Sequence, residues 1–425
     1  MKKPRFSVGS IVMLLVTAFV VVSMAAFLML IAGDDVYGRT RAVFGGLAER
    51  VESVTAEPTA APTHTPPPET TDAPTASPAP TATPDRSPKR IAIAAAGTIY
   101  APKAVRESAQ EGTDHYDFTT TFEGLSGALA GADLSIVTLE TTTAGREKGY
   151  GNYNTPPQIL DALRAVGVNF VSLATERALD KGYDGLDITA SELTSRSMGY
   201  AGVYPDGVNT GASMINVGGV QVAVLAYTYG LSDEGRERTK GDSRGVVALM
   251  ENERVMQDIA QARVNGANVV VVLTHWGTKN RAQTPDTVHA MAKNMAQAGA
   301  DVILGTHPNV VQGVERINTV RSDGLTYETV VCYSLGCLLT DARDSENTAG
   351  MAVRLEMVYD PAARRASPGE LTVTPLYIAR QREDRGVVYR VVNAEDEQTL
   401  QKLTLSEQAA AAQAAERVKN ATQEE

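Results

Sequence analysis

The chain has 425 residues, of which 43% are hydrophobic, so it is long enough to bury a sizeable core. Its formal net charge is −11, and no basic run follows Arg5. Phosphate backbones require concentrated lysine and arginine, so the composition excludes an electrostatic nucleic-acid binder.

A long apolar segment lies near the N-terminus. Residues 6–33 carry no charge, and the centre from Ile11 to Ile31 would span about 30 Å as a helix, the thickness of a bilayer core. Lysine and arginine precede this segment and two aspartates follow it, which predicts a cytoplasmic N-terminus. We therefore predict a single-pass signal anchor over residues 1–33 that contacts the lipid bilayer through residues 8–32 and holds an extracellular domain. A cleaved signal peptide is the alternative.

Residues 34–54 form a predicted juxtamembrane segment, and residues 55–89 form a linker. Between residues 55 and 88, 26 of 34 residues are Pro, Thr or Ala. Such a segment buries little apolar surface, so we expect a disordered stalk near polyproline II with a reach of at most roughly 100 Å. A spacer that lifts the domain into a cell wall is a more specific interpretation.

Residues 90–395 alternate between apolar runs and helical patterns, which predicts one α/β domain. The expected helices are Phe122 to Ala130, Pro157 to Val166, Gly185 to Met198, Asn252 to Gly266 and Thr287 to Gly299. The expected strands are Ile91 to Ala96, Leu134 to Leu139, Phe170 to Ala174, Val220 to Tyr227, Val269 to Thr274, Val302 to Gly305 and Thr329 to Leu335.

Three later strands without intervening helices predict a mixed sheet or a second packed sheet: Met351 to Tyr359, Leu371 to Ile378 and Gly386 to Val392. Residues 396–425 form a predicted tail, which from Leu403 is a surface helix or a frayed end. Cys332 and Cys337 face opposite sides of one apolar run if that run is a strand, so we interpret them as buried thiols rather than a disulfide.

Chemistry in α/β folds gathers at the carboxyl ends of strands. The expected strand ends contain, in chain order, ADLSIVTLETT, LATERALDKGYDGL, VVVVLTHWG, DVILGTHPNVVQGVE and CYSLGC. In this combination and order they resemble the CapA family of capsule or poly-γ-glutamate synthesis proteins, from about Arg90 to Asp341. The resemblance implies a branch of the calcineurin-type metallophosphatases and a four-layer α/β/β/α sandwich, here preceded by a transmembrane helix and a disordered stalk.

Several motif positions differ from the family pattern. Gly97-Thr98 replaces the usual Gly-Asp, and Thr138-Leu139-Glu140 replaces Asn-Leu-Glu. The Ala-Asn-Asn-His motif is replaced by Ala174, Thr175, Glu176 and Arg177, although Asp180 and Gly182 downstream still match.

The later motifs also depart from the pattern. His275-Trp276-Gly277 is intact, but Lys279 stands where the family usually has an acid. Asn309 replaces the second histidine of Gly-x-His-Pro-His, and Cys337 replaces the asparagine of Ser-Leu-Gly-Asn.

A two-metal centre requires a bridging carboxylate and several His, Asn and Asp ligands, and a guanidinium at Arg177 would repel a dication. We therefore expect a degenerate site without a cofactor. His275 and His307 with a carboxylate could still bind one Mn, Fe or Zn ion, whereas the alternative is a pair of histidines hydrogen-bonded to neighbours. The predicted pocket comprises Glu140, Glu176, Arg177, Asp180, His275, Trp276, His307, Asn309 and Cys337.

Two roles remain open for members of this pocket. The acids could bind a metal or could form salt bridges with Arg177 that replace the ions. Trp276 could belong to the core or pocket wall, or could be a platform for substrate.

These features predict a membrane-anchored, extracytoplasmic protein that binds, scaffolds or exports an anionic envelope polymer such as poly-γ-glutamate, with capsule-synthesis membrane subunits as partners. The alternative is an enzyme with a reduced metal site, either a phosphoester hydrolase or an amide-forming enzyme. A third hypothesis is a stalked wall protein without a small-molecule site.

Overall fold

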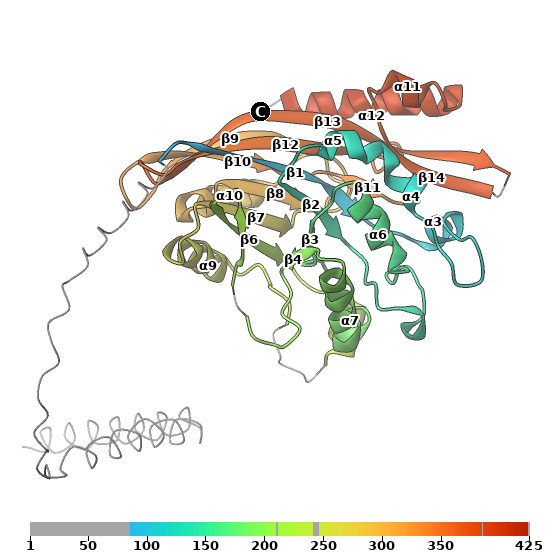
Figure 1. Ribbon diagram of the computed structural model, residues 1–425. Helices are drawn as coiled ribbons and strands as arrows, with labels where there is room; N and C mark the ends of the chain where they lie inside the picture. Colours follow the sequence, from blue (N-terminus) through green and yellow to red (C-terminus); the bar gives the residue numbers. More distant parts are fainter. Residues whose placement is uncertain (1–85, 210, 241–245, 385, 424–425) are drawn as a thin grey trace, which may run out of the picture. The chain divides into compact units, whose positions relative to one another are not determined.

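The computed structural model describes residues 86–209, 211–240, 246–384 and 386–423 (Figure 1). The predicted anchor, the juxtamembrane segment and nearly all of the predicted linker lie outside these residues. Among the residues that are described, no helix combines the length and apolar character needed to span a bilayer.

Two β-sheets form the centre of the described domain (Figure 1). The first has eight strands, in the order β14 (Gly386–Asn393), β13 (Arg365–Glu383), β12 (Ala349–Asp360), β1 (Lys89–Ile99), β2 (Leu134–Leu139), β3 (Phe170–Ser172) and β4 (Gly199–Ala201), with β11 (Cys337–Leu339) paired to the end of β1. The second has six, in the order β5 (Ser213–Val217), β6 (Val220–Thr228), β7 (Val269–His275), β8 (Val302–Thr306), β10 (Thr326–Cys332) and β9 (Val314–Val320).

Both sheets are mixed. The run β1-β2-β3-β4 is parallel, as is β6-β7-β8-β10, while β12, β13 and β14 add to the first sheet in antiparallel order. Because parallel strands need crossover connections, the helices fall between them in sequence. The carboxyl ends of each parallel run therefore lie along one edge of its sheet.

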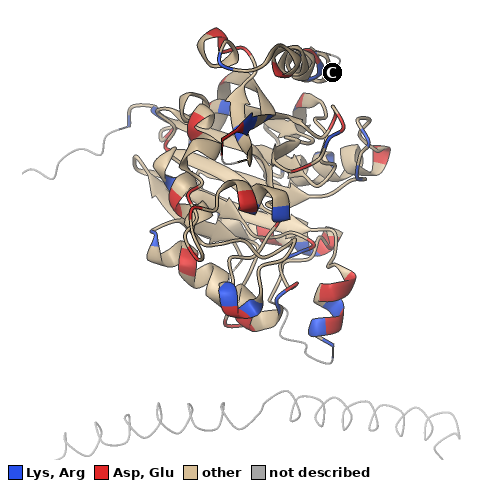
Figure 2. Cartoon of the chain, turned by 90° about the vertical axis from the view of Figure 1, so that its right-hand side faces the viewer, with Lys and Arg blue, Asp and Glu red and all other residues tan. Residues whose placement is uncertain are grey.

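The sheets pack face to face, and helices that carry many of the charged residues cover their outer faces (Figure 2). In β1, Ile91, Ile93 and Ala95 belong to the core between the sheets, whereas Ala94 and Ala96 belong to the core under the helices of the first sheet. That alternation explains why β1 is apolar at nearly every position. The helices on the first sheet are α3 (Lys103–Ser108), α4 (Thr119–Phe122), α5 (Ser126–Leu129), α6 (Gln158–Ala165) and α7 (Gly182–Ser195); those on the second are α9 (Asn252–Val264) and α10 (Asp286–Ala298).

The C-terminal segment is an ordered helix, so the frayed-end alternative is wrong. Helix α12 (Leu405–Gln423) follows the short helix α11 (Glu397–Leu400) and lies along β13 (Figure 1). Its buried Ala411, Ala414 and Val418 share one face at helical spacing, and Glu407 accepts a hydrogen bond of 2.7 Å from the hydroxyl of Tyr377.

Most expected elements are confirmed, but several boundaries are wrong. The helix expected over 185–198 runs over Gly182–Ser195, and the strand expected over 371–378 extends over Arg365–Glu383. The expected helix over 122–130 is broken into α4, a 3₁₀ turn (Glu123–Leu125) and α5. Gly124 lies against β14, where a Cβ would come within 2.4 Å of the Val391 carbonyl oxygen, so the segment follows the sheet instead of one helical axis.

Two of the expected strands end earlier than predicted. The strand expected to run to Ala174 stops at Ser172, and the one expected to run to Leu335 stops at Cys332. Leu335 leaves β10 because its N–H donates to the Gly305 carbonyl oxygen, at 3.0 Å, across the end of β8.

Gly97 allows the end of β1 to approach the loop before β11. A Cβ at this position would lie 2.2 Å from the carbonyl oxygen of Gly336, and the next residue, Thr98, donates its N–H to that oxygen at 3.0 Å. Backbone atoms cannot give way as a flexible side chain can.

We expect Gly97→Ala to lower the free energy of unfolding by at least roughly 2 kcal/mol, since the new methyl group overlaps backbone. Chemical denaturation of both proteins measures this difference. Gly127→Ala is the matched control: Gly127 is helical, and a Cβ there meets no atom within 4 Å, so its stability should stay equal or rise slightly. Equal stability of Gly97→Ala and the wild type would contradict the close approach.

Candidate functional site

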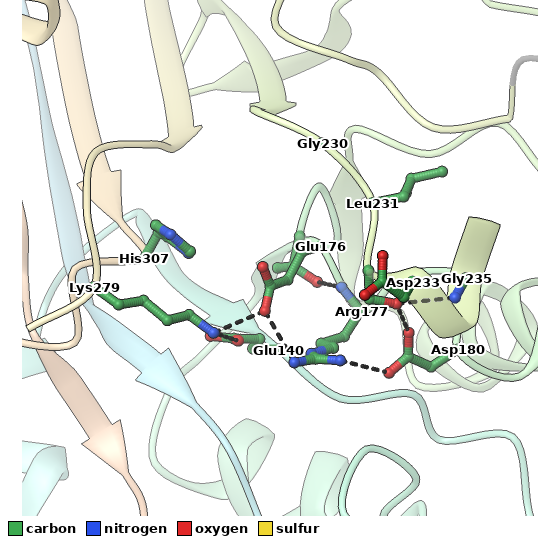
Figure 3. A network of polar contacts seen from close by, with 12 residues as sticks. Glu140, Glu176, Arg177, Asp180, Gly230, Leu231, Asp233, Gly235, Lys279 and His307 are labelled. Carbon is green, nitrogen blue, oxygen red and sulfur yellow. Dashed lines mark hydrogen bonds and ion pairs between the residues drawn. The ribbon is translucent and has the colours of Figure 1, made fainter. Parts of the chain in front are cut away.

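The carboxyl ends of parallel strands from both sheets meet around one group of charged side chains. Glu140 follows β2, Glu176 and Arg177 lie in the loop after β3, and Lys279 lies in the loop after β7. Together with Asp180 they form what we call the strand-end cluster (Figure 3). The topology places them together because each comes from the same edge of its sheet.

Lys279 joins the two sheets electrostatically. Its ammonium group donates a 2.7 Å hydrogen bond to Glu176 Oε1 and lies 3.8 Å from Glu140 Oε1. Burial opposes the charge of Lys279, but the two carboxylates outweigh it and raise the pKa of the ammonium above its ordinary value. Lys279 therefore stays protonated at neutral pH.

Arg177 holds the other side of the cluster. Its guanidinium lies 3.1 Å from Glu176 Oε1 and 3.5 Å from Asp180 Oδ2, and it stacks over the ring of Tyr153 with the guanidinium carbon 3.9 Å from the ring centroid. The heads of Lys279 and Arg177 thus converge on one carboxylate, as Figure 3 shows. Asp180 also accepts a hydrogen bond from the hydroxyl of Ser232.

The three carboxyl groups differ in how strongly they hold a proton. Burial raises the pKa of Glu140 to about 7, because Lys279 offsets only part of the lost hydration. Burial acts in the same direction on Glu176, but hydrogen bonds from Lys279 and Tyr229 outweigh it and lower its pKa. Burial also raises the pKa of Asp180, against the hydrogen bond from Ser232.

Two buried histidines lie beside the cluster at the ends of β7 and β8. His275 Nε2 and His307 Nδ1 are 3.1 Å apart, and His275 Nδ1 is 3.3 Å from the hydroxyl of Thr306. Burial, then the neighbouring His307, lowers the pKa of His275 well below its ordinary value; burial, then the Lys279 charge, lowers that of His307 to about 4. Both imidazoles are therefore neutral near pH 7, and one nitrogen of each is directed at the other.

The loop after β8 is conformationally strained. His307 and Asn309 have positive φ angles of 95° and 64°, which side-chain-bearing residues rarely adopt. The ring of Tyr229 packs against His307 at a centroid distance of 4.5 Å, and its hydroxyl donates to Glu176. Such strain is held in place by surrounding contacts and is common at functional sites.

Besides the two histidines, three residues of the predicted pocket lie outside the cluster. Trp276 is 2% exposed, belongs to the core under α9 and α10, and donates a 2.9 Å hydrogen bond to the Tyr333 carbonyl. Asn309 turns its carbonyl oxygen toward Cys337 Sγ, 3.4 Å away. Burial raises the pKa of the Cys337 thiol, so this sulfur is not a thiolate. Neither cysteine forms a disulfide.

Lys279, Tyr229 and Ser232 were missed as members of the site. For Lys279 the sequence held a signal, because this residue stands where the resemblance leads one to expect an acid. For Tyr229 and Ser232 no motif marks the loop after β6, and only the fold brings their hydroxyls to Glu176 and Asp180.

Most of the potential metal ligands at the strand ends contact other side chains of the chain. Glu140 and Glu176 face Lys279, and the two histidines face each other. The hydroxyl of Thr98 is the exception, since it is buried without a hydrogen-bond partner among the described residues. Within the described part of the chain, no three His, Cys, Asp or Glu side chains are grouped to bind one metal ion. Two cations, Lys279 and Arg177, thus lie among the carboxylates that a dinuclear centre would use.

The chain is an α/β protein with two mixed sheets, and its cluster of charged residues lies where the parallel strands of both sheets end. Residues 92–342 match the family model described as bacterial capsule synthesis protein PGA_cap. The chain belongs to this family of bacterial capsule synthesis proteins, and the resemblance to the CapA family is confirmed.

The curated relatives agree with this assignment. The chain is 26% identical over 226 residues to the PGA biosynthesis protein CapA of Bacillus subtilis (strain 168), a match covering 53% of this chain and 54% of that protein. It is 30% identical over 190 residues to the capsule biosynthesis protein CapA of Bacillus anthracis, covering 43% of each. The matches thus span about half the length of these relatives or less.

Two solved structures of low sequence identity align with the chain at TM-scores below 0.5. The calcineurin-like phosphoesterase YfkN from Bacillus subtilis aligns with 77% of this chain and 100% of its own, at 13% identity and a TM-score of 0.41. A phosphatase from Mycoplasma pneumoniae aligns with 68% of this chain and 94% of its own, at 12% identity and a TM-score of 0.40.

We expect Glu140→Gln to gain stability relative to the wild type as the pH rises. The folded-state pKa of Glu140 is about 7, above the ordinary value of 4.5, so folded wild type binds this proton more tightly and loses stability between pH 4.5 and 7. The glutamine does not titrate. The change amounts to on the order of 3 kcal/mol at most. Thermal melts at pH 5 and pH 8 measure it. If the stability of Glu140→Gln minus that of the wild type stays constant or falls as the pH rises, the raised pKa is contradicted.

Removing the bridging cation should destabilise the domain. We expect Lys279→Ala to cost roughly 1–3 kcal/mol, because Glu140 and Glu176 lose their shared partner while partly shielded from water. Lys103→Ala is the control: Lys103 faces Glu107 at 3.5 Å on the exposed surface of α3, and its loss should cost less than about 0.5 kcal/mol. Equal costs in urea titrations would show that Lys279 is an ordinary surface charge.

Proposed function

We propose that this protein is a membrane-anchored, extracytoplasmic capsule synthesis protein in which the strand-end cluster replaces a metal centre, and that it handles an anionic envelope polymer without hydrolysing phosphoesters. Family membership supports the capsule-related role. The two packed sheets with outer helices support a four-layer sandwich of metallophosphatase type.

One observation carries the proposal: Lys279 lies between Glu140 and Glu176, and Arg177 contacts Glu176 from the other side. A dication placed about 4 Å from a fixed unit charge is repelled by roughly 8 kcal/mol at an effective dielectric constant of 20. Three carboxyl groups, of which Glu140 has a pKa of about 7, face two permanent cations. Little negative charge is left to compensate even one metal ion.

The remaining elements of the proposal rest on the sequence. The apolar segment within residues 1–33 would anchor the chain with its N-terminus in the cytoplasm, and residues 55–89 would form the stalk. The polymer is a chain of carboxylates resembling poly-γ-glutamate, and membrane subunits of capsule synthesis are the proposed partners.

An enzyme with one Mn, Fe or Zn ion is the second candidate, and the histidine pair favours it. Metal ligation requires neutral imidazole, and both His275 and His307 are neutral near pH 7. His275 Nε2 and His307 Nδ1 are 3.1 Å apart, and two nitrogens that ligate one ion at about 2.1 Å lie about 3.0–3.4 Å from each other, so the pair is already close to a ligating distance. Such an ion would still have to recruit Glu140 or Glu176 from Lys279. Amide formation or phosphoester hydrolysis at that ion would then be the activity.

Metal analysis of the full-length chain purified in detergent tests the proposal. After incubation with Mn²⁺, Fe²⁺ or Zn²⁺ and removal of free ions, we expect far less than one ion per chain by mass spectrometry. His275→Ala with His307→Ala should leave that content unchanged. Stoichiometric metal that requires both histidines would contradict the proposal and favour the enzyme.

A restored variant sharpens the experiment. Thr98→Asp, Arg177→His and Lys279→Glu together remove both cations and supply the ligand types that the family pattern has at these positions. We expect this triple variant to bind metal while the wild type does not. Bound metal in the wild type at the level of the variant, or wild-type turnover of bis-p-nitrophenyl phosphate lost in the histidine variants, would contradict the replacement of the metal centre.

A further inference from the structure

A polar pocket lies at the edge of the second sheet opposite the strand-end cluster. It has a volume of about 400 Å³ and includes Asn268 and Asp301, which directly precede β7 and β8. It therefore opens at the amino ends of these strands, whereas the strand-end cluster lies at their carboxyl ends. Four arginines line it: Arg263, Arg321, Arg364 and Arg365.

Two of these arginines build the inner wall. Arg263 donates to the carbonyl oxygens of Gly299, at 2.7 and 3.1 Å, and Asn268, at 2.9 Å, and also contacts Asp301. Arg321 binds the other oxygen of Asp301 at 3.1 Å and the Ala300 carbonyl at 2.6 Å. Their donors are largely engaged with the protein, so they shape the pocket and contribute charge.

The other two arginines form the rim: Arg364 ends the turn between β12 and β13, and Arg365 is the first residue of β13. Arg364 is exposed, with a φ of 53° in the tight turn. Arg365 lies over the ring of Tyr327, 4.6 Å from its centroid, and donates one bond to the Thr326 carbonyl. Its Nε is buried and has no hydrogen-bond partner within the described ranges, so only the terminal nitrogens of its guanidinium can reach a ligand. The tips of β9–β10 and β12–β13 lie together at the left end of Figure 1.

The charge of this pocket is positive, in contrast to the chain as a whole. Its lining carries four arginines but only two acids. Asp301 is held between the two inner arginines, and Asp323 accepts from the Tyr327 hydroxyl at 2.6 Å and the Leu325 N–H at 2.9 Å. Two positive charges are left in excess on a chain whose net charge is −11.

We infer that this arginine pocket is an anion-binding site for the carboxylate groups of an extended polyanionic chain. Guanidinium groups bind carboxylates through paired, charge-assisted hydrogen bonds, and the rim arginines are the ones placed to offer them. The strand-end cluster cannot serve this purpose, because Lys279 and Arg177 are already paired with carboxylates. The inference rests on the proposed handling of an anionic polymer and places the contact at a different edge of the domain.

Binding of fluorescent poly-glutamate to the purified full-length chain in detergent tests the inference. We expect Arg364→Ala with Arg365→Ala to weaken binding by about tenfold or more, since two charge-assisted contacts are lost. Added salt should weaken the wild type more than this variant. The control is Arg380→Ala with Arg382→Ala, which removes the same charge from exposed positions at the far end of β13 and should stay within about twofold of wild type.

The outcomes separate the inference from the proposed function. If both double variants weaken poly-glutamate binding equally, or if neither does, the arginine pocket is not the binding site, although the protein still binds the polymer. A wild type that does not bind poly-glutamate would overturn both. Inorganic phosphate or free glutamate that competes as well as the polymer, residue for residue, would show a site for small anions only and would also overturn the inference.

Discussion

The site depends on one constraint: acids buried at the ends of parallel strands must be compensated by positive charge. Glu140, Glu176 and Asp180 are each less than 7% exposed. In water these groups would be ionised at neutral pH, but burial penalises the charged form unless a cation lies close by. Lys279 and Arg177 provide that charge from within the chain. A metal ion would do the same in a hydrolase, so the two solutions compete for the same carboxylates.

The fold explains why the buried carboxylates and their cationic partners meet at the strand ends. Parallel strands present their carboxyl ends along one edge, and the packing of two such sheets brings loops from distant parts of the chain together. Lys279 and Glu176 are 103 residues apart in sequence and are joined by a 2.7 Å hydrogen bond. The opposite edge of the second sheet carries the arginine pocket, where the balance of charge is reversed. One domain thus separates a charge-compensated cluster from a surface that attracts anions.

Much of the fold could be predicted from the sequence, because strands covered on both faces are nearly continuous apolar runs. The range of β2 was predicted to the residue for this reason, and Glu140 followed as the first polar side chain after it. Short strands such as β4 and β11, three residues each, carry too little periodicity to be recognised. The helix over 122–130 failed because contact with β14, a tertiary effect, overrode the local pattern.

For the site, motif positions located the acids and histidines but not their pairing. The sequence allowed Arg177 to be either a bar to metal or a partner for acids, and its contacts with Glu176 and Asp180 show the second role. Trp276 fits the core alternative rather than a substrate platform. Anomalous diffraction at the manganese edge, from crystals grown with excess Mn²⁺, tests the account most directly. The account predicts no anomalous peak among Glu140, His275 and His307, with the Lys279 ammonium between the two glutamates; two bridged peaks there would contradict it.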